Sequence, residues 1–183
     1  EPTNDDEHAF WQADLDDAAH RLAAILEGER ADVLCTYDDH GGYGHPDHIQ
    51  VHRVGVRAAE LAGTPRVFEM TMNRDMIREQ MAQRVFDDPS APADDPDGGG
   101  PVEDLDSFGS PEAMLTHAID VRTFLEAKRA AMIAHASQIP PDSFFLQMPE
   151  EIFAAAFGTE WYIEHGRTRA EGAAFGTDLF AGI

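Results

Sequence analysis

The sequence predicts an α/β domain with a Rossmann-like, mainly parallel sheet. Helical and strand patterns alternate along most of the 183 residues, which is typical of strands joined by helical crossovers. One short apolar run is followed directly by a glycine-rich turn and a helix start, the arrangement that places loops at the carboxyl edge of a parallel sheet. Hydrophobic residues make up 43% of the chain, enough for a packed core.

The first third of the chain carries the clearest pattern. Residues 13–28 have apolar side chains at helical spacing, and Gly28 stands where a helix would end. Residues 31–37 form an apolar run that predicts a strand buried on both faces. A second helix is predicted over 46–61, because proline opens it and Gly63 follows it.

The remaining elements are predicted from shorter patterns. They are a strand at 66–71, a helix capped by Asn73 and reaching about Phe86, a strand at 116–121, helices at 122–136 and 149–157, and a strand around 161–163. Residues 87–110 differ, because 87–106 hold eight acidic residues, four prolines, three glycines and no basic residue. We expect 87–110 to be an acidic mobile loop within one domain that spans 1–183.

Charge and cysteine content exclude several classes of function. The chain has 35 acidic and 13 basic residues, a formal net charge of -22. Nucleic acids and anionic membranes bind positive surfaces, so neither is an expected partner. Cys35 is the single cysteine, which excludes an internal disulfide and favours a reducing, cytoplasmic location. We expect Cys35 to be a structural thiol inside its strand.

Four of the nine histidines fall in the segment 37–52, between the first strand and the next helix. His45, His48 and His52 are three and four residues apart, so on a helix they share one face. Neutral imidazoles on one face suit zinc or iron. Asp47 could hydrogen-bond a neighbouring imidazole and fix its tautomer. The alternative interpretation, capping or surface histidines, stays open on spacing alone.

Other polar and sulfur-containing residues have weaker patterns. Asp38, Asp39 and His40 are typical of a turn. Four methionines, Met70 near the end of the second strand and Met72, Met76 and Met81 after it, are expected to be core or pocket wall.

The motif Gly-Gly-Tyr-Gly-His-Pro-Asp-His at 41–48 resembles a metal-site motif of the LmbE-like, or PIG-L, N-acetylglucosaminyl deacetylases. Within that family it is most similar to the actinobacterial mycothiol-pathway group of GlcNAc-inositol deacetylases and mycothiol S-conjugate amidases. Four further segments are similar to the same family: 10–12, 70–75, 128–138 and 147–160. The resemblance covers most of the chain outside the acidic loop.

The resemblance implies zinc-dependent hydrolysis of an N-acyl amide on a glucosaminyl-type sugar, with Fe²⁺ as an alternative metal. It implies that His48 is a metal ligand and that protonated His45 stabilises the oxyanion or assists the leaving amine. Asp47 would hold His45, and Tyr43 would be a mobile residue that faces the substrate. His135 would line the substrate site, although a packed helix that ends in a histidine is the other interpretation of that residue. A homo-oligomer is compatible with the sequence.

The chain departs from the family in one respect. The family's other motif, of the His-Pro-Asp-Asp-Glu type, supplies a zinc histidine, a zinc aspartate and the general base, and no such motif occurs in these 183 residues. We therefore expect this chain to be the C-terminal two-thirds of the family's fold, without a tight zinc site of its own. A non-catalytic remnant, or a small-molecule-binding domain of the same fold, is the alternative function.

Overall fold

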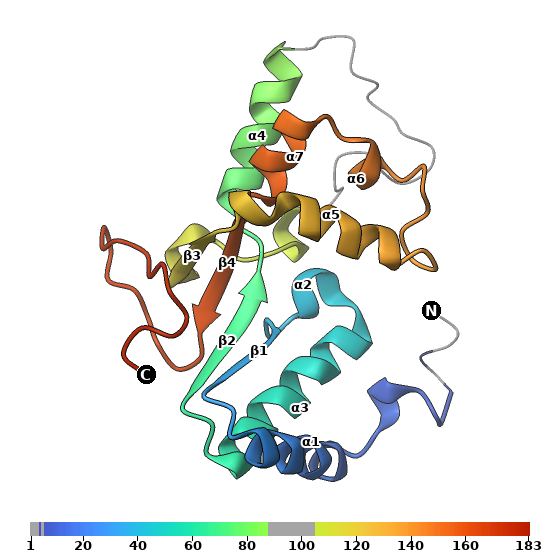
Figure 1. Cartoon of the computed structure of the whole chain (residues 1–183), viewed down its shortest axis with the longest axis vertical. Helices are drawn as coiled ribbons and strands as arrows, with labels where there is room; N and C mark the ends of the chain where they lie inside the picture. Colours follow the sequence, from blue (N-terminus) through green and yellow to red (C-terminus); the bar gives the residue numbers. More distant parts are fainter. Residues whose placement is uncertain (1–3, 5, 88–104) are drawn as a thin grey trace.

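The computed structural model describes residue 4, residues 6–87 and residues 105–183 (Figure 1). In chain order the elements are α1 (Leu15–Glu29), β1 (Val33–Tyr37), α2 (Gly41–Gly44), α3 (Pro46–Ala62), β2 (Arg66–Thr71), α4 (Arg74–Asp87), β3 (His117–Asp120), α5 (Leu125–Ala134), α6 (Phe144–Gln147), α7 (Glu150–Phe157) and β4 (Thr159–Glu164). Short 3₁₀ turns cover Phe10–Gln12, Leu105–Ser107, Glu112–Met114 and Arg122–Phe124. The predicted α/β class is confirmed.

The four strands form one mixed sheet in the order β1-β2-β4-β3. β1 and β2 are parallel, with Cys35 opposite Phe68, whereas β4 runs antiparallel to both β2 and β3. The expectation of a mainly parallel sheet therefore holds for the β1–β2 pair alone among the described strands. The strand patterns that indicated β3 and β4 carried no information on direction, which depends on the connections between them.

Helices α1 and α3 pack together along the β1–β2 part of the sheet (Figure 1). Small side chains make their contact close: Ala19, Ala23 and Ala58 are buried with Leu26. α1 is capped by the Asp14 carboxylate and continues through Gly28 to Glu29. The predicted end at Gly28 is therefore one residue early, because Arg30 adopts the left-handed conformation that terminates the helix.

Among the described strands, β1 lies at one edge of the sheet, and this corrects the prediction for it. Only Thr36 of its five residues is buried, and Cys35 is exposed. A run of apolar residues in the sequence does not distinguish an edge strand from a central one. Although the residue is exposed, its sulfur is partly desolvated, and this desolvation together with the negative charge of Glu160 raises the pKa of the Cys35 thiol, so the thiol stays protonated at neutral pH.

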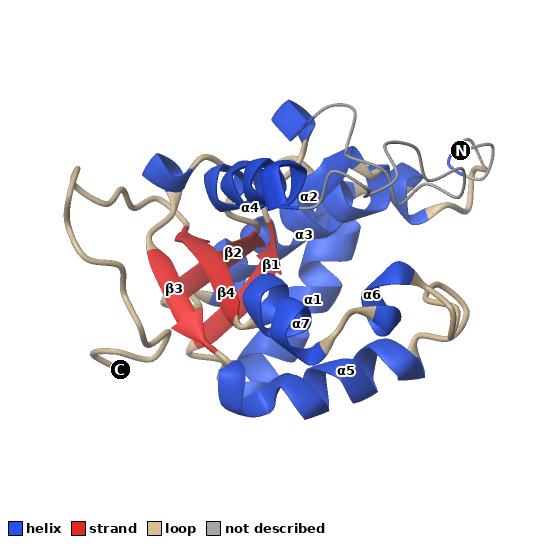
Figure 2. Ribbon diagram, turned by 90° about the horizontal axis from the view of Figure 1, so that it is seen from above, coloured by secondary structure: helices blue, strands red, loops and turns tan. Residues whose placement is uncertain are grey.

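The remaining helices gather beyond the carboxyl end of β2 (Figure 1). Figure 2 shows α5, α6 and α7 lying together beside the sheet. Arg129 of α5 joins them, because its guanidinium donates to the carbonyls of Leu146 and Met148 and lies 4.1 Å from the Phe153 ring centroid. Beside β3 and β4, Arg66 forms an ion pair with Glu164 at 3.1 Å, and Gly176 hydrogen-bonds the backbone around His117.

The acidic segment is described only at its ends. Residues 88–104 of the predicted 87–110 loop lie outside the described residues. Its last residues are held in place: Arg74 donates to the carbonyls of Phe108 and Gly109, and the Gly109 N–H donates to the Gly42 carbonyl. None of the helices in the described part of the chain is both long and apolar enough to cross a bilayer.

Candidate functional site

The glycine-histidine motif folds into the short, kinked helix α2 at the carboxyl end of β1. Gly41 has a φ of 69° and Gly42 a φ of 77°, a region that residues with a Cβ rarely adopt. A Cβ at Gly41 would lie 2.7 Å from the Cβ of His48. Glycine is therefore required at position 41, both by the backbone conformation and by the close approach of α3.

This close approach orients the His48 side chain. Its Nδ1 lies 3.2 Å from the Gly41 carbonyl oxygen, which fixes the proton on Nδ1 and leaves Nε2 as a lone-pair donor. The ring stacks on Tyr37, with centroids 4.1 Å apart and planes at 9°. Nε2 of His48 is thus available to a metal or a substrate, while Nδ1 contacts the Gly41 carbonyl and one face of the ring contacts Tyr37.

His45 precedes α3 and caps its first turn. The backbone N–H of Asp47 donates to His45 Nδ1 at 3.2 Å, so the proton of the neutral ring is on Nε2. The Asp47 carboxylate instead accepts the backbone N–H of Trp11 at 3.0 Å. The contact between Asp47 and His45 is therefore made through the backbone of Asp47, because the helix turn directs its side chain toward the N-terminal segment.

Tyr43 projects from α2 beside both histidines. It is about half exposed, and its ring meets that of His48 edge-on at 5.2 Å and lies 6.3 Å from that of His45. The Phe108 ring also stacks with Tyr43, with centroids 6.5 Å apart. The two histidine rings are 4.8 Å apart. The structure therefore brings together Tyr43, His45 and His48.

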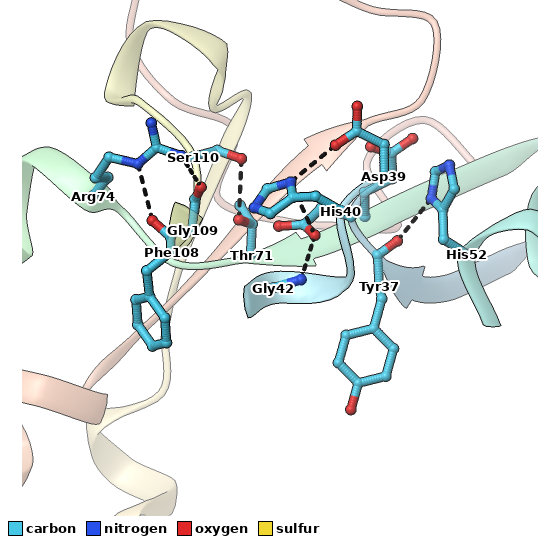
Figure 3. A network of polar contacts seen from close by, with 12 residues as sticks. Tyr37, Asp39, His40, Gly42, His52, Thr71, Arg74, Phe108, Gly109 and Ser110 are labelled. Atoms are coloured by element: carbon cyan, nitrogen blue, oxygen red, sulfur yellow. Dashed lines mark hydrogen bonds and ion pairs between the residues drawn. The ribbon is translucent and has the colours of Figure 1, made fainter. Parts of the chain in front are cut away.

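The turn at Asp38, Asp39 and His40 holds a second polar cluster (Figure 3). Asp38 is 1% exposed, and its Oδ1 accepts the Gly42 N–H at 2.6 Å. His40 Nδ1 lies 3.0 Å from Asp39 Oδ1 and 3.4 Å from Asp38 Oδ1. These three residues form the one group of three possible metal ligands found among the described side chains. Sequence reasoning interpreted them as a turn, which they also form.

A cavity of about 910 Å³ begins beside Tyr43 and His48 and extends between β2, α4, α5 and α7. Tyr37, Tyr43 and His48 line one end of it. Six of the seven methionines in the chain contribute to its walls: Met70, Met72, Met76, Met81, Met132 and Met148. The four methionines that were predicted to be core or pocket wall therefore belong to a pocket wall.

A charged pair that sequence reasoning did not identify also lines the cavity. Lys128 of α5 lies 2.9 Å from Glu160 of β4, and the Tyr162 hydroxyl donates to the same carboxylate at 2.8 Å. Burial alone raises the pKa of Glu160, but the hydrogen bonds from Lys128 and Tyr162 outweigh it and lower that pKa. Burial and the bond to Glu160 raise the pKa of Tyr162. Lys128 and Glu160 are 32 residues apart in sequence, so no local pattern indicated the pair.

Two other histidines, His135 and His52, lie apart from the group formed by Tyr43, His45 and His48. His135 ends α5, is exposed, and its Nδ1 lies 2.8 Å from the Ala131 carbonyl oxygen. Neighbours on the same helix, Lys128 and Met132, line the cavity, whereas His135 is not part of its lining. His52 Nδ1 lies 3.0 Å from the Tyr37 carbonyl oxygen, so this histidine has a structural contact with the end of β1.

The donors near His48 do not complete a zinc site within the described residues. Catalytic zinc takes three protein ligands, and no group of three possible ligands that includes His48 is present in residues 6–87 and 105–183. His48 Nε2 can supply one ligand. The orientation of its ring by Gly41 matches that of metal-binding histidines, whose second nitrogen is commonly fixed by a carbonyl.

Comparisons with known proteins agree with the motif. No protein-family model matches the sequence. The 1D-myo-inositol 2-acetamido-2-deoxy-alpha-D-glucopyranoside deacetylase of Acidothermus cellulolyticus is 42% identical over 188 residues, which cover 100% of this chain and 62% of that protein. Proteins of the same name from Streptomyces avermitilis and Thermobifida fusca are 41% and 39% identical, over 96% and 98% of this chain and 62% and 65% of their own length.

The chain thus spans about three-fifths of the length of the curated relatives it matches. The similarity extends along the whole chain and includes the motif that forms α2 and the start of α3. By its sequence, the chain is therefore similar along its whole length to the 1D-myo-inositol 2-acetamido-2-deoxy-alpha-D-glucopyranoside deacetylases.

Proposed function

We propose that the protein to which this chain belongs hydrolyses the N-acetyl amide of a glucosaminyl sugar. The observation that carries the proposal is the grouping of Tyr43, His45 and His48, of which Tyr43 and His48 line a cavity, in a chain similar to GlcNAc-inositol deacetylases along its entire length. Two imidazoles and a phenol can bind and polarise an amide carbonyl and move a proton to the leaving amine.

His45 is the proton-transfer residue in this proposal. The Asp47 backbone N–H occupies its Nδ1, so the proton on Nε2 faces away from the helix start. The Nε2–H of His45 can donate to the carbonyl oxygen of the substrate as negative charge develops there, or to the departing amine. Tyr43 is more exposed and can add its hydroxyl to the same oxygen.

A zinc ion is the proposed cofactor, with His48 Nε2 as one ligand; bound zinc polarises a carbonyl and lowers the pKa of a coordinated water. Because the described residues do not complete its ligand set, the other ligands must come from elsewhere in the protein. We infer no step that depends on the ion. The same incomplete ligand set favours the second candidate, a domain that binds an N-acyl sugar without hydrolysing it.

A chimera separates the two candidates. In this chimera, the chain replaces the matching residues of the Acidothermus cellulolyticus relative. Amine release from GlcNAc-inositol is measured together with zinc content. We expect the chimera to hold about one zinc per chain and to release amine. The isolated chain is the comparison, and we expect it to bind zinc weakly.

His48→Gln in the chimera removes the proposed metal ligand, and we expect both zinc content and activity to fall, the activity by roughly 100-fold or more. His135→Gln is the matched control, because that exposed residue lies outside the cavity lining. A folded chimera that binds the sugar but releases no amine would contradict the deacetylase proposal and support the binding domain.

A further inference from the structure

We propose that the methionine-lined cavity holds the alkyl chain of an N-acyl group longer than acetyl. The substrate class would then be N-acyl glucosaminyl compounds with acyl chains of several carbons. This inference rests on the proposed function in placing an amide at His48, and it concerns which acyl groups the site accepts. Four observations carry it: the position of the cavity, its volume, the partners of polar side chains in its walls, and the apolar side chains that line it.

The cavity is continuous with the proposed site. His48 and Tyr43 line the same space as Met76 of α4 and Met132 of α5. A group attached to an amide at His48 therefore has a direct path between α4, α5 and α7. The acyl carbon is the atom that His45 and Tyr43 would polarise, so the substituent on that carbon lies at the mouth of the cavity.

The volume far exceeds what an acetyl group needs. The cavity measures about 910 Å³, near the upper end of the 300–1,000 Å³ typical of pockets for small-molecule ligands. An acetyl group places one methyl group beyond the carbonyl. A space of this size left to solvent would keep its apolar side chains in contact with water, which is unfavourable.

Five polar side chains in the walls already have hydrogen-bond or ion-pair partners, which argues against a sugar in this space. Asn73 donates to Glu112, Gln80 donates to the Ala155 carbonyl, and Thr71 donates to Ser110. Lys128 and Glu160 pair with one another. The indole N–H of Trp161 is buried without a hydrogen-bond partner in the described structure, but one donor does not match the several hydroxyls of a sugar.

The walls are chemically suited to an alkyl chain. Six methionines with unbranched, polarisable side chains surround the space, joined by aromatic side chains such as Phe157 and Phe108. Methionine adapts its rotamers to irregular apolar ligands at little cost. An alkyl chain demands no hydrogen bonds, so the engaged polar groups keep their partners when it binds.

The test is a series of ligands on the chain as it exists. Isothermal titration calorimetry with N-acetyl-, N-butanoyl- and N-hexanoylglucosamine measures affinity, which does not require zinc or hydrolysis. Burial of each added methylene should tighten binding about threefold to fourfold, so N-hexanoylglucosamine should bind roughly 100-fold more tightly than N-acetylglucosamine.

Two methionine-to-glutamine variants, in which the side chain keeps nearly the same shape, test whether the acyl chain binds in this cavity. Met132→Gln places an amide in the cavity wall and should weaken N-hexanoylglucosamine binding about tenfold. Met114→Gln is the matched control, since Met114 is 51% exposed and lies outside the cavity lining, and it should leave affinity unchanged. If Met132→Gln unfolds the chain, Ala156→Phe, which fills the cavity, should abolish the gain from the longer chain.

Affinity that does not change with chain length, or that falls equally in Met132→Gln and Met114→Gln, would overturn the proposal. The outcome is distinguishable from that of the deacetylase test. Chain-length-dependent binding with no amine release from the chimera would retain the acyl pocket and reject hydrolysis, whereas release of acetate without chain-length-dependent binding would do the reverse.

Discussion

The two walls of the cavity position their side chains by opposite means. On the α2 side, the backbone sets the geometry: glycines with positive φ bring Gly41 against His48, and a carbonyl and a ring then fix the imidazole. On the α4 and α5 side, flexible methionines fill space without hydrogen bonds. The difference implies that one wall is built for precise placement and the other for adaptable contact, so substitutions should have unequal consequences.

Gly41→Ala should have the largest effect, because the new Cβ would lie 2.7 Å from the His48 Cβ on a backbone with φ of 69°. We expect a loss of about 2 kcal/mol or more in the free energy of unfolding, measured by urea denaturation. Gly28→Ala is the control: nothing lies within 4 Å of its Cβ position inside α1, and there we expect a gain of about 0.5 to 1 kcal/mol. Equal effects at the two glycines would contradict the close packing of Gly41 against His48.

Most elements, and the mouth of the site, could be predicted from the sequence. β2 matches its predicted range, α3 begins at Pro46 and ends before Gly63, and Asn73 caps α4 through its side-chain oxygen. These features are local, since caps, proline and side-chain spacing act within a few residues. The neighbours Tyr43, His45 and His48 came together for the same reason.

The rest depended on contacts between distant residues. The exposed edge position of β1, the antiparallel direction of β4 and the Lys128–Glu160 pair all require the order of the strands. Cys35 illustrates the point: the apolar run around it predicted a buried strand, but β1 lies at the edge of the sheet and Cys35 is exposed. The Asp47 carboxylate likewise bonds Trp11, 36 residues away, rather than its neighbour His45.

Lys128→Met should have the next largest effect and would show whether the cavity needs its charged pair. Glu160 would keep only Tyr162 as a partner, so its lowered pKa should rise. A carboxylate with a lowered pKa stabilises the fold above its unfolded pKa, and that stability disappears as the pH falls through the folded pKa. We expect a loss of about 1 kcal/mol at pH 7, which shrinks toward pH 3.

Urea denaturation across this pH range measures the effect, and NMR titration of Glu160 measures the pKa. The control is Arg122→Ala, which breaks the exposed pair with Asp120 and should cost less than about 0.5 kcal/mol. An unchanged Glu160 pKa in Lys128→Met would show that the pair contributes nothing to the cavity wall.

A smaller, pH-dependent effect is expected at His117, which packs against Phe68 and Gly176 outside both walls. Burial, opposed by Glu164 and assisted by Arg66, lowers its pKa. The unfolded chain therefore binds the proton first, so stability should decrease as the pH falls from about 6.5 toward the folded pKa, by at most roughly 1.4 kcal/mol per pH unit. His117→Gln should flatten this part of the stability curve; a curve parallel to that of the parent chain would exclude His117 as its cause.

The smallest effect is expected for Met76→Leu, on the adaptable wall. Leucine keeps the apolar character and nearly the volume of methionine, so the free energy of unfolding should change by less than about 1 kcal/mol. Its branched, stiffer side chain should nevertheless narrow the range of acyl chains that bind, because adaptation to different ligands is what an unbranched thioether provides. Calorimetry with the N-acylglucosamine series would therefore reveal a change that denaturation does not. A large loss of stability in Met76→Leu would show that this wall is packed as rigidly as the Gly41–His48 contact, and that the two walls do not differ in kind.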